Sequence, residues 1–203
     1  MKTDDGRLIV IGGASRSGKT AYVKKRTAIE RRLIAWDPED QWAQLPGWKR
    51  ITSRADLLSA AKKPGPQKLA FVAGGQLAAE FDYWSKIVMY AGRYVAPLAC
   101  IAEELADVTT TAKAPGGWGI LLRRGLKRGI TIYAISQRWA EADKTAVGNA
   151  SEFVLFRQSS ADDVRYLSRK TRIDETQLNG LKPLEFVRFD IFTGQIERGK
   201  LRF

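Results

Sequence analysis

Gly13-Ala14-Ser15-Arg16-Ser17-Gly18-Lys19-Thr20 is the stretch that decides the fold of this 203-residue chain. It follows the apolar run Leu8-Ile9-Val10-Ile11 and leads through Ala21 into a segment suited to a helix. A loop bounded by glycines between a strand and a helix, and ending in Gly-Lys-Thr, is typical of a phosphate-binding loop. The glycines permit a tight turn that exposes consecutive backbone N–H groups, and the helix adds the positive end of its dipole. The pattern predicts a nucleoside triphosphate site at residues 13–21, rather than an ordinary glycine turn.

Two side chains of this loop have expected roles in binding the phosphates. Lys19 is expected to reach the β- and γ-phosphates with its ammonium group. The hydroxyl of Thr20 is a hard oxygen ligand, of the kind that Mg²⁺ prefers. ATP and Mg²⁺ are therefore the expected cofactors.

The composition restricts the chemistry that remains available. The chain has no histidine and a single cysteine, which excludes histidine bases, His/Cys zinc sites and internal disulfides. Cys100 lies in an apolar segment and is expected to be a core residue. Lys and Arg number 34 against 22 Asp and Glu, a net charge of +12, which favours a polyanionic partner such as nucleic acid. No apolar run approaches the length of a membrane span, and the charged start does not resemble a signal peptide, so a cytoplasmic location is expected.

Strands and helices alternate along the chain. Strands are expected at residues 7–11, 32–36, 50–51, 68–72, 97–102, 130–136 and 153–156, followed by a hairpin of 185–192 and 195–201. Helices are expected at residues 18–31, 55–61, 76–93, through 121–122, and at 143–147, 161–170 and 174–181. This alternation predicts an α/β fold with a mostly parallel central sheet flanked by helices and a C-terminal β-hairpin. Residues 1–203 are expected to form a single domain.

One helix carries a regular apolar stripe. Its members recur at spacings of four, three, four and three residues: Leu77, Phe81, Trp84, Val88 and Ala91. Such spacing places them on one face of the 76–93 helix, so they are expected to pack in the core rather than bind a cofactor.

Polar residues follow two of the expected strands. Glu103 and Glu104 come directly after the apolar strand 97–102, and Ser136-Gln137 ends strand 130–136. Hydrolysis of a triphosphate needs a carboxylate that supports the metal and a group that orients or activates water. Glu103 is the expected metal ligand with Thr20, and Glu104 is expected to polarise the water. The alternative is an acidic start of a helix, where carboxylates also favour the helix dipole.

Gln137 is the third expected catalytic residue, beside Lys19 and Glu104. Its amide is placed to sense the γ-phosphate or to hold the attacking water. A glutamine after a strand is weak evidence by itself, and the order of phosphate loop, acidic pair and polar strand end gives it weight.

A basic segment precedes strand 130–136. It contains Arg123, Arg124, Lys127 and Arg128. One of these arginines could act in trans on the γ-phosphate of a neighbouring subunit, the segment could contact DNA phosphates, or the cations could simply stabilise a helix C-terminus. Lys113, in the loop 109–117, is a candidate DNA contact together with Lys127, although a plain connecting loop is an equal reading.

The sequence resembles the FtsK/HerA superfamily of DNA-pumping ATPases. Within it, the chain is similar to the compact branch of genome-packaging ATPases from membrane-containing, double jelly-roll viruses of the tectivirus-like group. The resembling segments, in the order of the family, are Gly13–Thr20, Trp36–Pro38, Ile101–Leu105, Arg124–Ile130, Ile135–Arg138 and Asn149–Phe156. The phosphate loop is specific only for nucleotide binding. The basic-Gly-basic segment that feeds a strand ending in Ser-Gln-Arg points to this superfamily.

The resemblance implies a RecA-like (ASCE) P-loop NTPase fold, Mg²⁺-dependent ATP hydrolysis, and a homo-oligomeric ring, expected to be a hexamer, that threads double-stranded DNA without reading its sequence. It also implies contact with capsid vertex proteins, and a location in the host cytoplasm or at the packaging vertex of the virion. Relatives often have arginine after the glycine that matches Gly125, whereas this chain has Leu126. The trans arginine is therefore unassigned, with Arg124 and Arg128 the nearest candidates and Arg123 a third.

Three alternatives stay open. A nucleoside or nucleotide kinase shares the phosphate loop and the approximate size, but the paired glutamates and the high positive charge argue against it. An assembly or extrusion ATPase of the filamentous-phage type typically carries a membrane segment. A nucleotide-gated DNA-binding module would bind ATP and DNA without turnover.

Overall fold

A single mixed sheet runs through the molecule. The structure, a computed structural model, describes residues 5–94, 97–112, 114 and 116–202. The strand order of the sheet is β3-β4-β2-β5-β6-β1-β7-β8-β9. The strands are β1 (Leu8–Gly12), β2 (Arg32–Trp36), β3 (Trp48–Ile51), β4 (Gln67–Phe71), β5 (Leu98–Ala102), β6 (Ile130–Ser136), β7 (Glu152–Phe156), β8 (Glu185–Asp190) and β9 (Ile196–Lys200).

The strands from β3 to β7 in this order are all parallel, and only β8 and β9 run antiparallel to their neighbours. Parallel strands covered on both faces are mostly apolar. β1, β2, β5 and β7 are buried along their whole length, and among them only the first residues of β2 and β7, Arg32 and Glu152, are charged. The predicted α/β class, with a mostly parallel sheet and a C-terminal hairpin, is confirmed.

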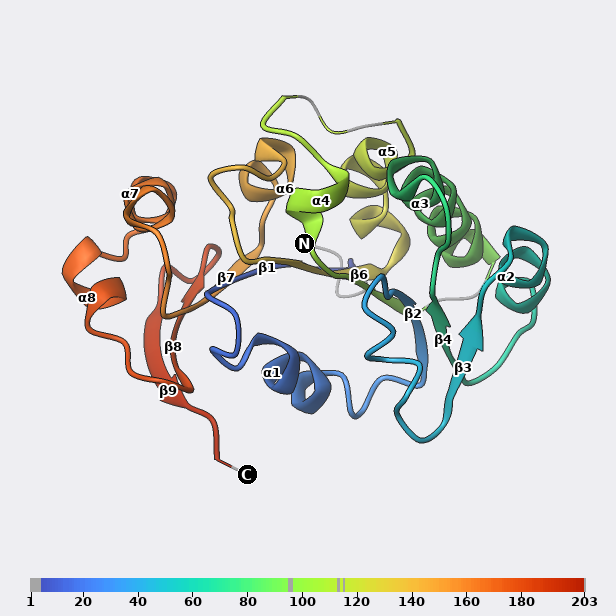
Figure 1. Cartoon of the computed structure of the whole chain (residues 1–203), viewed down its shortest axis with the longest axis horizontal. Helices are drawn as coiled ribbons and strands as arrows, with labels where there is room; N and C mark the ends of the chain where they lie inside the picture. Colours follow the sequence, from blue (N-terminus) through green and yellow to red (C-terminus); the bar gives the residue numbers. More distant parts are fainter. Residues whose placement is uncertain (1–4, 95–96, 113, 115, 203) are drawn as a thin grey trace.

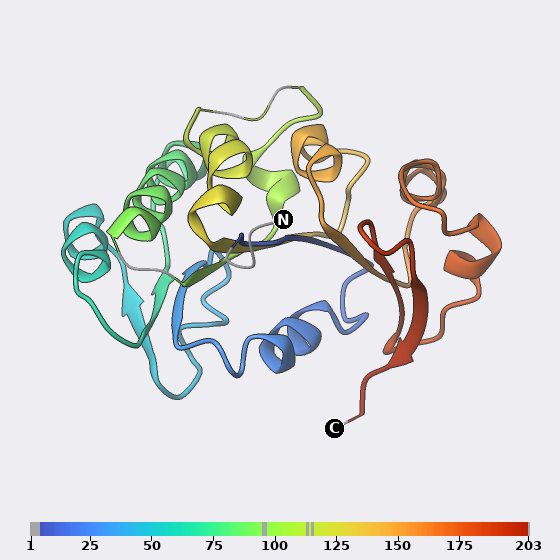
Figure 2. The same cartoon turned by 180° about the vertical axis from the view of Figure 1, so that it is seen from behind.

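The helices cover the two faces of the sheet unequally. They are α1 (Lys19–Arg26), α2 (Arg54–Ala61), α3 (Leu77–Tyr94), α4 (Leu105–Val108), α5 (Gly116–Arg124), α6 (Lys144–Gly148), α7 (Ala161–Lys170) and α8 (Glu175–Asn179), with a 3₁₀ turn, η1 (Leu126–Arg128). Figures 1 and 2 show α1 on one face and α3, α4, α5 and α6 together on the other, with α7 and α8 beside the β8–β9 hairpin. None of the helices in the described part of the chain combines the length and the apolar character needed to cross a lipid bilayer.

Aromatic side chains fill the core beneath α3. Phe81 stacks on Trp84 with ring centroids 5.4 Å apart, and both lie against Trp36 of β2. Trp118 of α5 packs on Phe81 from the other side. Phe81, Trp84, Val88 and Ala91 of the predicted stripe are buried, as expected, whereas Leu77 is 37% exposed because it is the first residue of the helix.

The first helix is shorter than its predicted range of 18–31. It ends at Arg26, where the hydroxyl of Thr27 turns back to donate to the carbonyl of Val23. The chain then turns through Ala28–Glu30, with Ile29 exposed, before it enters β2. The short elements α4 and η1 were not predicted, because four- and three-residue helices leave no periodic pattern.

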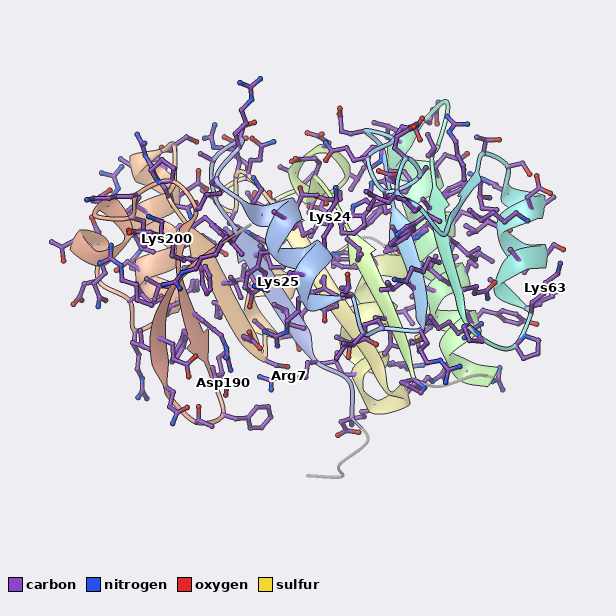
Figure 3. The ribbon with its side chains drawn as sticks, turned by 90° about the horizontal axis from the view of Figure 1, so that it is seen from below. Arg7, Lys24, Lys25, Lys63, Asp190 and Lys200 are labelled. Carbon is purple, nitrogen blue, oxygen red and sulfur yellow. The ribbon has the colours of Figure 1, made fainter. Side chains whose placement is uncertain are left out.

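A buried carboxylate ties β1, β7, β8 and α1 together. Glu152, 0% exposed, accepts two hydrogen bonds of 3.0 Å from Arg26 and lies 3.3 Å from Arg7 and 3.1 Å from Arg188. Arg7 also pairs with Asp190 at 2.5 Å, and Figure 3 shows these two side chains at one end of the sheet. Three arginines around one buried carboxylate offset its desolvation. These charges connect the hairpin to α1 and to the residue before β1, in addition to the backbone hydrogen bonds that join β8 to β7.

Both edge strands carry charged side chains. β9 has Glu197, Arg198 and Lys200 along its length, and β3 exposes Lys49 and Arg50. Charges along an edge are a common protection against pairing with the strand of another molecule.

Phe81→Ala should lower the free energy of unfolding by about 3–5 kcal/mol, because it removes a buried ring from the cluster under α3. Leu77→Ala on the same helix is the matched control and should cost less than about 1 kcal/mol, since the leucine is partly exposed. Urea denaturation of the two variants measures both values. Equal losses would contradict the packing described here.

Candidate active site

At two positions, the loop between β1 and α1 has a backbone conformation that only glycine adopts easily. Gly13 has φ +156° and Gly18 has φ +117°. A Cβ atom at Gly13 would lie 2.7 Å from the Cβ of Phe156, so the loop also has no room for a side chain there. Arg16, at the tip, adopts a left-handed φ of +58°. The glycines therefore close the loop tightly around the start of α1, at Lys19.

The ammonium of Lys19 is held inside this loop. Its Nζ donates to the carbonyl oxygens of Gly13 at 2.8 Å and Ala14 at 2.9 Å, and the residue is 6% exposed. Burial lowers the pKa of Lys19, against the opposing effect of the facing Glu104 and Glu103. The ammonium group is thus held by two neutral carbonyl acceptors. An anionic ligand would be a stronger acceptor and could replace them.

Glu103 lies directly after β5 and is buried. Its Oε1 accepts a hydrogen bond of 3.0 Å from Nε1 of Trp42. Burial, together with the neighbouring Glu104, raises the pKa of Glu103 to about 7. The hydrogen bond from Trp42 and the charge of Lys19 oppose this rise because they favour the ionised form. Both protonation states are therefore accessible near neutral pH, and a nearby cation would favour the ionised state.

Glu104 contacts Gln137 directly. The amide Nε2 of Gln137 donates to Oε1 of Glu104 at 2.8 Å. Glu104 precedes α4 with a left-handed φ of +45°, and its side chain makes no capping hydrogen bond to that helix. The carboxylate is thus turned away from the helix that it precedes, which argues against the alternative of a plain acidic helix start.

A polar cleft of about 330 Å³ joins these parts. Its wall consists of Ser15, Arg16, Lys19, Thr20, Asp37, Glu39, Gln41, Glu103, Glu104 and Gln137. The structure thus brings together the phosphate loop, the acidic pair and the polar end of β6. It does so because β5, β6 and β1 are neighbours in one parallel sheet, so their carboxyl ends share one edge.

A second cavity of about 420 Å³ adjoins the first at the tip of the loop. Ser15 and Arg16 line both, and the second also has Ala14 and Ser17 from the loop. Its other wall follows β7, at residues 157–159, with Pro183. From the phosphate loop, the two cavities together are lined by Ala14–Ser17, Lys19 and Thr20.

The basic residues predicted before β6 lie elsewhere. Arg123, Arg124, Lys127 and Arg128 are exposed and precede the first residue of β6, whereas the cleft lies beyond its last residue. Seven strand residues span about 20 Å, so these side chains are at the opposite end of the sheet from the cleft of their own chain. Lys113 lies outside the described residues.

The sequence analysis did not assign Asp37 and Trp42 to the site. The carboxylate of Asp37, 1% exposed, accepts hydrogen bonds from the backbone N–H groups of Gln41 at 2.8 Å and of Trp42 and Ala43 at 2.9 Å. Burial raises the pKa of Asp37, and the three hydrogen bonds oppose that rise. Asp37 orders the segment that presents Trp42 to Glu103. The available signal was the position of Asp37 after an apolar strand, within the Trp36–Pro38 segment that resembles the superfamily; no role at the site was assigned to it.

The donor set fits a magnesium ion. Thr20 and Glu103, the two expected ligands, line the same cleft, and their oxygens are the hard donors that Mg²⁺ prefers. Among the described residues, no group of three or more His, Cys, Asp or Glu side chains converges as a metal cage. This agrees with Mg²⁺ sites that use one or two protein ligands and complete the shell with water and phosphate oxygens.

The chain is similar in sequence to a phage protein and in fold to a viral and a bacterial protein. No family model matches the chain. Over 140 residues it is 32% identical to Protein P9 of Pseudoalteromonas phage PM2, a match that covers 68% of this chain and 62% of P9. The genome-packaging NTPase B204 of Sulfolobus turreted icosahedral virus 2, solved with ATP-gammaS, matches with a TM-score of 0.79 at 17% identity, over 100% of both chains.

The chain has the P-loop NTPase fold of B204. The bacterial conjugative coupling protein TrwB matches less closely, with a TM-score of 0.68 at 10% identity, over 99% of this chain and 86% of TrwB. The resemblance to viral genome-packaging ATPases expected from the sequence, and the RecA-like fold class, are confirmed.

Glu103→Gln should change how stability depends on pH. The folded-state pKa of Glu103, about 7, lies above its ordinary value of 4.5, so its contribution to stability is present below pH 4.5 and is lost as the pH rises through 7. Glutamine abolishes that loss. The difference in unfolding free energy between variant and parent should therefore shift in favour of the variant between pH 5 and pH 8, by on the order of 2 kcal/mol.

Urea denaturation at the two pH values measures this difference. Glu175→Gln, at an exposed position on α8, is the matched control and should behave alike at both pH values. A pH-independent effect of Glu103→Gln would mean that the carboxyl titrates normally.

Proposed function

We propose that this chain is an ATPase that binds ATP and Mg²⁺ and uses hydrolysis to translocate double-stranded DNA during packaging of a viral genome. One observation carries the proposal: Lys19, the Glu103–Glu104 pair and Gln137 converge on one polar cleft beside the phosphate loop. The B204 fold and the sequence similarity to P9 support the packaging role. Because the match covers less than two thirds of P9, the activity is proposed from the site itself.

The phosphate loop supplies binding and charge. Backbone N–H groups of residues 13–21 hold the phosphates, and Lys19 leaves the carbonyls of Gly13 and Ala14 to contact the β- and γ-phosphates. Thr20 and Glu103 would hold Mg²⁺, which would neutralise charge on the phosphate oxygens.

Glu104 and Gln137 orient the attacking water. Their 2.8 Å hydrogen bond holds the Glu104 carboxylate at the cleft. In the proposed reaction Glu104 accepts a hydrogen bond from the attacking water, and Gln137 contacts the γ-phosphate. The hydrogen bond between Glu104 and Gln137 therefore opens when the water and the triphosphate are both bound.

Assembly into a ring supplies the remaining charge. Arg123, Arg124 and Arg128 lie far from the cleft of their own chain and are exposed, which leaves them available to an adjacent subunit. We propose that one of them contacts the γ-phosphate of that subunit, in a ring expected to have six members. Capsid vertex proteins are the proposed further partners.

Lys19→Ala or Glu104→Gln should reduce the rate of ATP hydrolysis at least about 100-fold, because each removes a group that stabilises charge or orients water in the transition state. Release of phosphate from ATP measures the rate. The matched controls Lys62→Ala, on the surface after α2, and Glu175→Gln should retain parental activity. Normal turnover by Glu104→Gln would remove Glu104 from the proposed role.

Double-stranded DNA should stimulate the ATPase, and its binding should weaken steeply with salt, because a motor that ignores sequence grips phosphates. ATPase rates with and without duplex, and fluorescence anisotropy of labelled duplexes of unrelated sequence over a range of salt, measure these effects. Phosphorylated nucleoside in the same mixture would instead identify a kinase. Binding of ATP and DNA without turnover would identify a nucleotide-gated binding module.

A further inference from the structure

A basic groove lies between α6 and α7, apart from the candidate active site. It has a volume of about 460 Å³. Lys144, the first residue of α6, lines one wall, and Arg165, Arg169 and Lys170 of α7 line the other. Figures 1 and 2 show α6 and α7 side by side on the same face of the sheet. Arg165 and Arg169 are four residues apart, so they lie on one face of the helix.

Positive charge in this groove is in excess. Asp162 is the one carboxylate in its wall, and it pairs with Arg165 at 2.5 Å. Within the described part of the chain, Lys144, Arg169 and Lys170 have no carboxylate at ion-pair distance. Lys170 lies above the ring of Tyr166, 6.0 Å from its centroid. Arg169 donates from Nε to the backbone carbonyl of Arg165 at 3.3 Å. Three of the four cations therefore have no carboxylate partner among the described residues, and they can bind an external anion.

The basic wall is firmly attached to the core. Val164 and Leu167 on the opposite face of α7 are buried, and the ring of Tyr166 is largely covered. The cations thus project from a helix whose other side is packed, so an anion bound in the groove would bind to a fixed surface.

A short segment connects this groove with the nucleotide cleft. Asp163 of α7, 0% exposed, accepts hydrogen bonds from the backbone N–H of Ala140 at 2.8 Å and from Nε of Arg138 at 2.9 Å. Ala140 lines the groove, and Arg138 follows Gln137, which lines the cleft. A displacement of Gln137 would therefore act on α7 through these two hydrogen bonds.

We infer that the α6–α7 groove binds the sugar-phosphate backbone of double-stranded DNA, and that it forms a contact surface distinct from the basic segment before β6. The inference rests on the proposed function, whose DNA partner it places on a surface. The ammonium and guanidinium groups of the groove match the phosphates, which take a large share of protein–DNA hydrogen bonds. Hydrogen bonds to Asp163 couple the grip on DNA to the state of Gln137.

The test is a double variant, Lys144→Gln with Arg169→Gln. Its affinity for a short duplex should fall about tenfold, and the slope of log affinity against log salt should become shallower by about 1.8, or about 0.9 for each lost phosphate contact. Anisotropy of labelled duplexes of unrelated sequence measures both. Lys62→Gln with Lys63→Gln, two exposed lysines after α2, is the charge-matched control and should leave both values unchanged.

A charge-preserving pair, Lys144→Arg with Arg169→Lys, separates the loss of charge from damage to the fold, and it should bind duplex as the parent does. Circular dichroism and thermal unfolding verify that all three variants are folded. If the parent binds duplex but the neutralised variant keeps parental affinity and slope, the groove is not the DNA surface, and the proposed function is unaffected. If the parent neither hydrolyses ATP nor binds duplex, the proposed function fails and this inference fails with it.

Discussion

Gly12 of β1 lies opposite Ser136 of β6 in a parallel register, and the candidate site depends on that pairing. One residue further along each strand, the chain enters the phosphate loop on one side and reaches Gln137 on the other. β5 pairs with the other edge of β6, which brings Glu103 and Glu104 to the same end of the sheet. If another strand stood in the place of β6, between β1 and β5, each segment could still fold locally. Gln137 would then no longer lie beside the phosphate loop and the acidic pair.

Local sequence predicted the elements of this site but not their neighbours. The strand 32–36 was predicted at its observed bounds, and the phosphate loop and the acidic pair were placed after the correct strands, because each is encoded by contiguous residues. The order of the strands was not predicted, since it depends on contacts between segments far apart in the chain. The same limit applies to the bond between Gln137 and Glu104, 33 positions apart, and to Trp42 and Glu103, 61 positions apart. Asp37 illustrates the problem: its role is set by three backbone groups that a single sequence does not identify.

Burial opposes ionisation on both sides of the cleft. The pKa of Lys19 is lowered and that of Glu103 is raised, so each group is in an environment that favours its neutral form. In the proposed function, a triphosphate and a cation bring the opposite charges to these two groups. Ligand binding would therefore offset a desolvation cost that the fold already carries, which is a common arrangement at functional sites.

The charged edges of the sheet limit how copies of this chain can associate. Extending the sheet from one molecule into the next would partly desolvate the exposed charges of Lys49 and Arg50 on β3, or of Glu197, Arg198 and Lys200 on β9. In the proposed ring, contacts between copies would then form through helices and connecting loops, whose shapes can differ between two orientations of adjacent molecules. An interface of that kind can slide or reopen without breaking a continuous ladder of backbone hydrogen bonds.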